Sequence, residues 1–271
     1  MVMNKIVKML MLALLAVPMA WAETPVHSAF DHGPWDKLLS AYVHPVNDGK
    51  ATAVDYQGFK NDQRDLKQYL SALSLVSEKQ FDQWSKPDQL AFLINAYNAW
   101  TVELILTVWP NLESIKDLGG FLSSPWSKEF VSLLGETRTL DNIEHKLIRG
   151  SGRYNDPRIH FAVNCASIGC PALRAAAYSG NKLEQQLDEQ MALFLADRSR
   201  NREDGDIIKL SSIFKWYRED FEKGWHGYRR LEDFLLAHTS DLELSNSMVK
   251  KLSNDDADIE FLDYDWHLNK R

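Results

Sequence analysis

The stretch from residue 88 to about residue 108 most strongly constrains how this 271-residue chain can fold. Pro87 stands at its start, where the first turn of a helix tolerates proline, and Pro110 follows its end. Apolar side chains occur almost all the way round a helix of this length, which is typical of a helix buried on every side. The sequence therefore predicts a central helix that the rest of the chain encloses.

Three polar residues interrupt this predicted helix at a spacing of three, namely Asn95, Asn98 and Thr101. That spacing places them close to one stripe of the helix. Burying an amide without a partner costs about 1–3 kcal/mol, so both asparagines need hydrogen bonds. Two interpretations are open. In one, Asn98 orients a catalytic base or binds substrate, with Asn95 beside it; in the other, both amides bond to neighbouring backbone.

The remaining pattern favours helices over strands. Helices are predicted over residues 30–43, 58–73, 77–84, 141–149, 182–196, 211–223 and 231–237. Strands are predicted over residues 53–56, 159–165, 207–210 and 259–264, with a hairpin over 131–140. The strands do not alternate regularly with helices, so the predicted class is α+β. We expect a mostly helical single domain over residues 23–271 with a small, largely antiparallel sheet.

The first 22 residues have the pattern of a signal peptide. Lys5 and Lys8 precede an apolar run over residues 9–16, and Ala20-Trp21-Ala22 provides a small-x-small cleavage pattern before Glu23. The run is shorter than the about 20 residues of a membrane span. We therefore expect cleavage, a periplasmic or secreted protein, and no stable membrane span after cleavage.

Charge limits the class of partner. The chain has 31 basic and 38 acidic residues, a net charge of −7, and no cluster of lysine and arginine. Loss of residues 1–22 would remove two lysines and no acid, making the chain more negative. Such a chain is poorly suited to bind nucleic acid, so we expect no nucleic-acid partner.

Both cysteines of the chain lie in one short segment, residues 158–173, together with His160. Apolar and other residues alternate over 159–165, which predicts a strand that ends at Cys165. A turn and a helix over residues 173–177 are expected to follow. A thiol between a strand end and a helix N-terminus would have a lowered pKa.

Three interpretations of these cysteines are open. Cys165 is a nucleophile with a histidine as its base, and His145 is favoured because His160 would face the other side of the strand. Alternatively, Cys165 and Cys170 form a disulfide, the default for two cysteines in an oxidising compartment. In the third, His145, His160 and both cysteines bind zinc, although their spacing is irregular for such a site.

The segment over residues 140–149 contributes two further candidates. Asp141 as N-cap, with Glu144 three residues on, forms a variant capping box, which gives Glu144 a structural role. His145 has no such role, so it is either a general base or a half-buried packing residue. The aromatic segments over 210–221 and 261–269 are interpreted as packing rather than chemistry.

Several of these motifs, taken together and in order, resemble the family of domains of unknown function numbered 547 (DUF547), found in exported bacterial proteins. The resemblance covers about residues 50–269 and rests on residues 91–99, 143–145, 160–165, 170–173 and 262–269. It implies a domain and a cluster of site residues, without naming a reaction. The family's motifs fall here on Asn98, Glu144, His145, His160, Asn164, Cys165 and Cys170.

Two functional hypotheses follow. The first is an exported cysteine-dependent hydrolase or acyltransferase for a small-molecule or peptide substrate, without metal or other cofactor. Cys165 would attack an amide or thioester, His145 would be the base, and Glu144 or Asn98 would orient it. Backbone N–H groups after Cys165 would form an oxyanion hole. The second is a non-catalytic periplasmic binding or assembly module in which the Cys165–Cys170 disulfide is structural.

Overall fold

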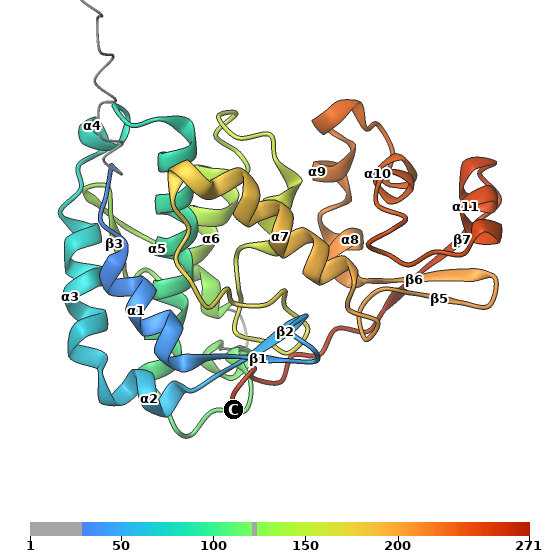
Figure 1. Cartoon of the computed structure of the whole chain (residues 1–271). Helices are drawn as coiled ribbons and strands as arrows, with labels where there is room; N and C mark the ends of the chain where they lie inside the picture. Colours follow the sequence, from blue (N-terminus) through green and yellow to red (C-terminus); the bar gives the residue numbers. More distant parts are fainter. Residues whose placement is uncertain (1–28, 121–123) are drawn as a thin grey trace, which may run out of the picture.

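The computed structural model describes residues 29–120 and 124–271 (Figure 1). The predicted signal peptide, residues 1–22, lies outside this range. The first part of the described chain contains α1 (Gly33–Tyr42), β1 (Val43–Val46), β2 (Ala51–Val54), α2 (Tyr56–Asn61), α3 (Gln63–Ser74), α4 (Glu78–Phe81), α5 (Lys86–Leu106), the 3-10 helices η1 (Ile115–Leu118) and η2 (Pro125–Ser127), β3 (Val131–Leu133), β4 (Glu136–Arg138), α6 (Leu140–Asn142) and the π-helix η3 (Ile143–Ile148).

The second part begins at a buried 3-10 helix and ends in a small sheet. Its elements are η4 (Pro157–Phe161), η5 (Gly180–Lys182), α7 (Leu183–Leu195), β5 (Arg202–Asp204), β6 (Ile207–Ser211), α8 (Ser212–Trp216), α9 (Arg218–Glu222), η6 (Trp225–Gly227), α10 (Leu231–Ala237), α11 (Asn246–Ser253) and β7 (Asp258–Leu262). β5–β6 is antiparallel and β6–β7 is parallel, whereas β1–β2 and β3–β4 are antiparallel hairpins. The predicted α+β class, mostly helical with small sheets, is confirmed.

Helix α5 is the axis of the larger hydrophobic cluster, which we call the N-terminal core. The Ser85 hydroxyl accepts a hydrogen bond from the N–H of Asp88 and caps the helix, and Pro87 lies in its first turn. Nearly every residue from Gln89 to Leu106 is buried, and α2, α3, η3 and η5 pack around them. The prediction of an enclosed central helix is confirmed. No helix in the described ranges is both long enough and apolar enough to cross a membrane.

A second cluster, the C-terminal core, is rich in phenylalanine. It is built from α7, α8, α9, α10, α11 and β6, and its largest side chains are Phe161, Phe194, Phe214, Phe221 and Phe234. In Figure 1 these elements lie to the right of α5, with α7 crossing between the two parts.

After β7 the chain returns to the N-terminal core as an extended segment, residues 263–271, which we call the C-terminal strap (Figure 1). Near its end, the carbonyl of Asn269 accepts a hydrogen bond from the N–H of Val54, and its side chain accepts one from the Tyr56 hydroxyl, at 2.8 and 2.7 Å. The strap therefore ties the two cores together.

The segment around the cysteines differs from the prediction. Residues 159–165 form no strand, because Pro157 and the capping side chain of Asp156 start the 3-10 helix η4 there. The apparent alternation carried no strand signal, since residues on both supposed faces, including His160 and Asn164, are buried.

The helix expected over residues 173–177 is also absent. The backbone of this region bonds to side chains of other elements instead: the N–H of Ala177 donates to Asp36, and its carbonyl accepts from Gln186. The helix N-terminus that was expected to lower the pKa of Cys165 does not exist.

Candidate active site

A cavity of about 170 Å³ brings together residues from both cores and from the C-terminal strap. Among the residues predicted from the sequence, its lining includes Glu144, His145, His160, Cys165 and Cys170. Asn95, Asn98 and Asn164 are buried outside the lining.

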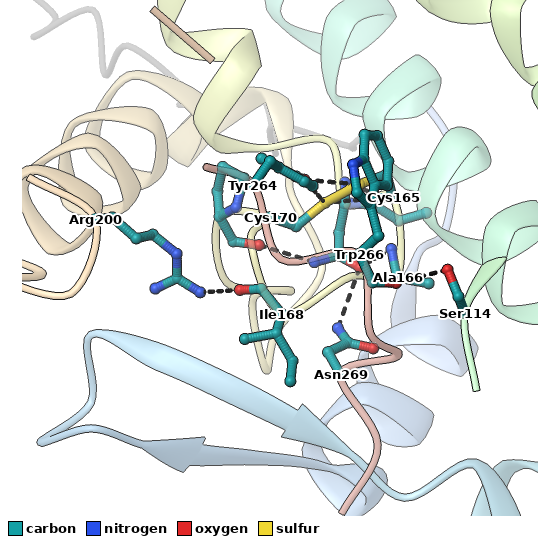
Figure 2. Close-up of a disulfide and its surroundings, with 12 residues drawn as sticks. Ser114, Cys165, Ala166, Ile168, Cys170, Arg200, Tyr264, Trp266 and Asn269 are labelled. Atoms are coloured by element: carbon teal, nitrogen blue, oxygen red, sulfur yellow. Dashed lines mark hydrogen bonds between the residues drawn. A yellow bond between two sulfur atoms is a disulfide. The ribbon is translucent and has the colours of Figure 1, made fainter. Parts of the chain in front are cut away.

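A disulfide joins Cys165 and Cys170 at the cavity wall, with their Cα atoms 6.2 Å apart (Figure 2). The hydroxyl of Tyr264 lies 3.1 Å from Cys165 Sγ and 3.2 Å from Cys170 Sγ. Burial raises the pKa of Tyr264 above its usual range, so this group stays a protonated hydroxyl beside both sulfurs. Cys170 is buried and Cys165 is partly exposed, so Cys165 is the more accessible residue of the pair.

Asparagine side chains fix the loop that carries the disulfide. The Asn98 amide donates to the carbonyl of Ala162 at 3.0 Å and accepts from the N–H of Asn164 at 2.8 Å. The Asn164 side chain in turn accepts from the N–H of Ala166, which adopts a φ of 64°. Such left-handed backbone is uncommon for alanine and needs support from its surroundings.

Asn95 behaves like Asn98. Its amide donates to the carbonyl of Tyr178 at 2.8 Å and accepts from the N–H of the same residue at 3.0 Å. Of the two interpretations of these amides, the structure has the one in which both bond to neighbouring backbone.

The C-terminal strap covers the other side of the loop. The N–H groups of Ile168 and Gly169 donate to the carbonyls of His267 and Asp265, each at 2.8 Å. A Cβ atom on Gly169 would stand 3.0 Å from both the Asp265 carbonyl and the Tyr264 ring, so a larger residue would have to displace the strap by a few tenths of an ångström.

These hydrogen bonds also correct the predicted oxyanion hole. After Cys165, the N–H of Ala166 donates to Asn164 and that of Cys170 to the Ser167 carbonyl, while Ile168 and Gly169 bond to the strap. Four N–H groups that follow the cysteine are thus engaged: Asn164 accepts one, Ser167 accepts one, and the strap accepts two.

Glu144 and His145 lie on the π-helix η3, a rare conformation that is frequent at functional sites. The N-cap differs from the prediction: Thr139, rather than Asp141, caps α6 by accepting from the N–H of Asn142 at 2.9 Å. Glu144 therefore has no capping role. Its side chain is 8 % exposed, and its Oε1 atom has no hydrogen-bond partner.

Glu144 affects the pKa of two neighbouring tyrosine hydroxyls. Burial, then the negative charge of Glu144, and also a hydrogen bond to its carboxylate raise the pKa of Tyr97 and of Tyr217 well above the usual value. Both tyrosines line the cavity, so they stay neutral hydrogen-bond donors there.

The lone pair of His145 is already occupied. Nη1 of Arg149 lies 2.8 Å from His145 Nδ1, and because a guanidinium can only donate, Nδ1 is the acceptor. A neutral ring then carries its proton on Nε2, 3.9 Å from an Asp141 oxygen. In this arrangement Nδ1 of His145 is occupied by Arg149 and does not face a substrate as a free acceptor.

His160 has the opposite arrangement. Its Nε2 lies 2.8 Å from Oδ2 of Asp220, and its Nδ1 is buried without a hydrogen-bond partner. Burial lowers the pKa of His160 despite the hydrogen bond to Asp220, so the ring is neutral at pH 7. The expectation that His160 faces away from Cys165 is wrong, because both line the same cavity and the strand on which that expectation rested is absent.

Asp220 was not identified from the sequence. Burial raises its pKa, but hydrogen bonds from His160, Arg149 and Lys223 together outweigh burial and hold the pKa well below its usual value. The carboxylate therefore stays ionised and orients the His160 ring, in the manner of a carboxylate–histidine pair. Asp220 is one of three acidic residues in α9, with Glu219 and Glu222, and it belongs to the aromatic segment that sequence reasoning had assigned to packing.

Aromatic rings form the rest of the wall. The centroid of Trp266 lies 4.5 Å from that of Tyr264 and 5.8 Å from that of Trp216, and Trp126 is 5.9 Å from Trp266. All four residues line the cavity. Three of them come from the two segments interpreted as packing; the signal was the density of tryptophan and tyrosine beside acidic residues in both.

Within the described ranges, no group of three or more His, Cys, Asp or Glu side chains is placed to hold a metal ion. Residues 81–195 match the family described as "Protein of unknown function, DUF547". No curated protein and no solved structure matches the chain. The matched segment includes Glu144, His145, His160 and both cysteines, whereas Asp220 and Tyr264 lie beyond it. This match supports the resemblance seen in the sequence and places residues 81–195 in the DUF547 family.

Proposed function

We propose that this protein is a cysteine-dependent hydrolase or acyltransferase. The observation that carries the proposal is one cavity lined by a partly exposed cysteine, a protonated tyrosine hydroxyl beside it and a buried histidine with a free lone pair. These groups are the nucleophile, hydrogen-bond donor and base of thiol-based acyl transfer.

The roles follow from hydrogen bonding. Cys165 is the nucleophile because it is the more exposed residue of the pair. His160, rather than His145, is the better base, since its Nδ1 is free while Arg149 occupies that of His145. Asp220 holds the His160 ring through Nε2. The Tyr264 hydroxyl would stabilise the thiolate and lower the pKa of the thiol.

The disulfide must first be reduced, which requires two electrons and two protons from an external dithiol. The Cys165 thiol then gives its proton to His160 Nδ1 and its sulfur bonds to the carbonyl carbon of an amide or thioester. The leaving amine or thiol departs with that proton, and water or a second acceptor releases the acyl group from sulfur. An external disulfide that accepts two electrons and two protons would re-form the bond between Cys170 and Cys165.

The second candidate, a non-catalytic binding or assembly module, is favoured by the disulfide itself. In that case the Cys165–Cys170 bond only closes the loop beneath the strap, and the cavity binds a ligand without transforming it.

Alkylation of the reduced protein separates the two candidates. The rate of iodoacetamide modification of Cys165 would be followed against pH by peptide mass, in the parent chain and in the variants His160→Gln and His145→Gln. We expect Cys165 to react at lower pH than an ordinary thiol with a pKa of about 8.5. His160→Gln should abolish this behaviour, and His145→Gln should preserve it. An ordinary thiol profile that neither variant changes would favour the binding module.

Export belongs to the same proposal. The signal-peptide pattern over residues 1–22 predicts that the mature chain begins at Glu23, in the periplasm or the medium. The intact mass of the protein recovered from a periplasmic fraction tests this: a mass that includes residues 1–22 would contradict it.

A further inference from the structure

One carboxylate oxygen of Glu144 and one ring nitrogen of His160 are buried hydrogen-bond acceptors without a donor, and both residues line the cavity. Oε1 of Glu144 and Nδ1 of His160 have no hydrogen-bond partner, and their side chains are only 8 % and 1 % exposed. Buried polar atoms in folded proteins are almost always paired. Two unpaired acceptors in one cavity therefore indicate a bound group that supplies N–H or O–H donors.

The N–H group of His160 already donates to Asp220, so the ring has only an acceptor left for a ligand. Its Nε2 faces the ionised Asp220 carboxylate at 2.8 Å, so Nε2 carries the proton and Nδ1 is a bare acceptor. Glu144 contributes negative charge at the same cavity. The raised pKa of the neighbouring Tyr97 and Tyr217 is due chiefly to burial, and the charge of Glu144 adds to it. A ligand with several donors and a positive charge satisfies both acceptors.

The charge at the cavity wall is negative. Asp141 and Glu144 both line it. Burial raises the pKa of Asp141; a smaller effect of His145 lowers it, and the charge of Glu144 raises it further. The nearby cation Arg149 is engaged elsewhere, since it donates to Asp220 at 2.5 Å and to His145 at 2.8 Å. A positive ligand would compensate this charge.

The aromatic wall suits a cation with an apolar body. Two cations of the protein already lie over aromatic rings of this site. Nζ of Lys116 is 4.5 Å from the centre of the Trp266 ring, and the Arg149 guanidinium is 4.7 Å from the centre of the Tyr217 ring. Trp216 and Trp266 present stacked rings 5.8 Å apart. Indole faces attract cations and pack against hydrocarbon.

We propose that the cavity binds a small organic primary amine in its ammonium form, with the ammonium group between Glu144 Oε1 and His160 Nδ1 and the carbon skeleton against Trp216 and Trp266. The volume of about 170 Å³ accommodates a ligand with a single ring. For comparison, a cavity of about 150 Å³ holds benzene. This inference deepens the proposed function and rests on it for its meaning, because the amine would be the acyl acceptor: once the leaving group has departed with the Cys165 proton, His160 Nδ1 is free to take a proton from the ammonium, and the resulting amine attacks the acyl group on Cys165.

Binding is tested on the oxidised protein, so that no thiol chemistry takes part. Calorimetric titration at pH 7 would compare benzylamine with three ligands of similar shape: benzyl alcohol, benzyltrimethylammonium and benzoate. We expect saturable binding of benzylamine and binding of the other three at least roughly tenfold weaker, since each lacks either the charge or the N–H donors. Equal affinity for benzyl alcohol, or no saturable binding of benzylamine, would overturn the inference.

A matched pair of variants tests the assigned partner. Glu144→Gln keeps the side-chain size and removes the charge, and should weaken benzylamine binding by roughly tenfold or more while changing the affinity for benzyl alcohol little. Glu260→Gln, at an exposed position of β7 remote from the cavity lining, should change neither. Unchanged benzylamine affinity in Glu144→Gln would overturn the assignment. If Glu144→Gln does not fold, the four-ligand comparison on the parent chain still decides.

The two proposals fail separately. If benzylamine binds as expected and reduced Cys165 behaves as an ordinary thiol, the amine site stands and the thiol enzyme fails. If Cys165 shows the reactivity proposed and benzylamine does not bind, the amine site is overturned and the enzyme stands.

Discussion

The buried polar residues of α5 and those of the cavity wall look alike in exposure and differ in their hydrogen bonds. Asn95 and Asn98 are at most 2 % exposed, and each makes one donor and one acceptor bond to backbone. Glu144 and His160 are 6 % and 2 % exposed, and each retains an unpaired acceptor. Asn98 holds the backbone that leads into the cysteine loop and Asn95 holds the backbone at Tyr178, whereas the two cavity residues each have an acceptor free for a ligand. Burial alone does not separate scaffold from site in this protein; hydrogen-bond satisfaction does.

The largest effect on stability is expected from the scaffold side. Asn98→Ala would leave the carbonyl of Ala162 and the N–H of Asn164 buried without partners. Two such losses predict a decrease of about 2–5 kcal/mol in the free energy of unfolding, measured by urea denaturation. Asn246→Ala, on the exposed surface of α11, is the control and should change it little. A cost below about 0.5 kcal/mol for Asn98→Ala would break the comparison, because surface substitutions have effects of that size.

The disulfide is expected to have the next largest effect. Cys165 and Cys170 are separated by 5 residues, so the bond closes a short loop, and its loss in Cys170→Ser predicts about 2 kcal/mol of destabilisation. Reducing the parent chain should produce a similar loss in the same denaturation experiment. Equal stability of the oxidised and reduced protein would show that the C-terminal strap and the asparagines alone hold the loop.

A smaller effect is expected from pH. Burial lowers the pKa of His160 in the folded protein, and burial likewise lowers the pKa of His32 to about 4. Below the unfolded-state value of 6.5, the unfolded chain therefore binds protons that the folded chain does not. The free energy of unfolding should be fully developed above pH 6.5 and should decrease as the pH falls from 6.5 towards the lower folded-state values.

Variants assign this pH dependence. His160→Asn should flatten the slope of stability against pH between pH 7 and 5, whatever its effect on stability at pH 7 itself. His267→Asn is the matched control, because that side chain is 77 % exposed. An unchanged slope in His160→Asn would mean that His160 is not held neutral in the folded state.

The smallest effect on stability is expected at Glu144, even though it is buried. Its Oε1 atom makes no hydrogen bond, so Glu144→Gln removes a desolvated charge without breaking a bond to that atom. We expect the free energy of unfolding to stay the same or to increase, while amine binding weakens. A decrease above about 2 kcal/mol, the range for breaking a charged hydrogen bond, would mean that Glu144 holds the fold together as Asn95 and Asn98 do.

Sequence reasoning succeeded where one local signal dominated. The apolar circumference of α5, with Ser85 and Pro87 before it, leaves little choice but a buried helix. It failed over residues 159–165, where alternation suggested a strand. Every face of η4 is buried, so the pattern of apolar residues does not indicate which secondary structure forms there. The asparagines were recognised as needing partners, but their partners lie 64 to 83 residues away and could not be named.

What the sequence by itself determined is the helical class, the central helix and the list of groups able to do chemistry, because these depend on residue type and short-range spacing. Only the tertiary structure decided which of those groups share a cavity and which lone pairs stay free. Arg149 occupies His145, Asp220 orients His160, and Tyr264 reaches both sulfurs from the C-terminal strap. Each of these depends on contacts between segments far apart in the chain, which no local pattern encodes.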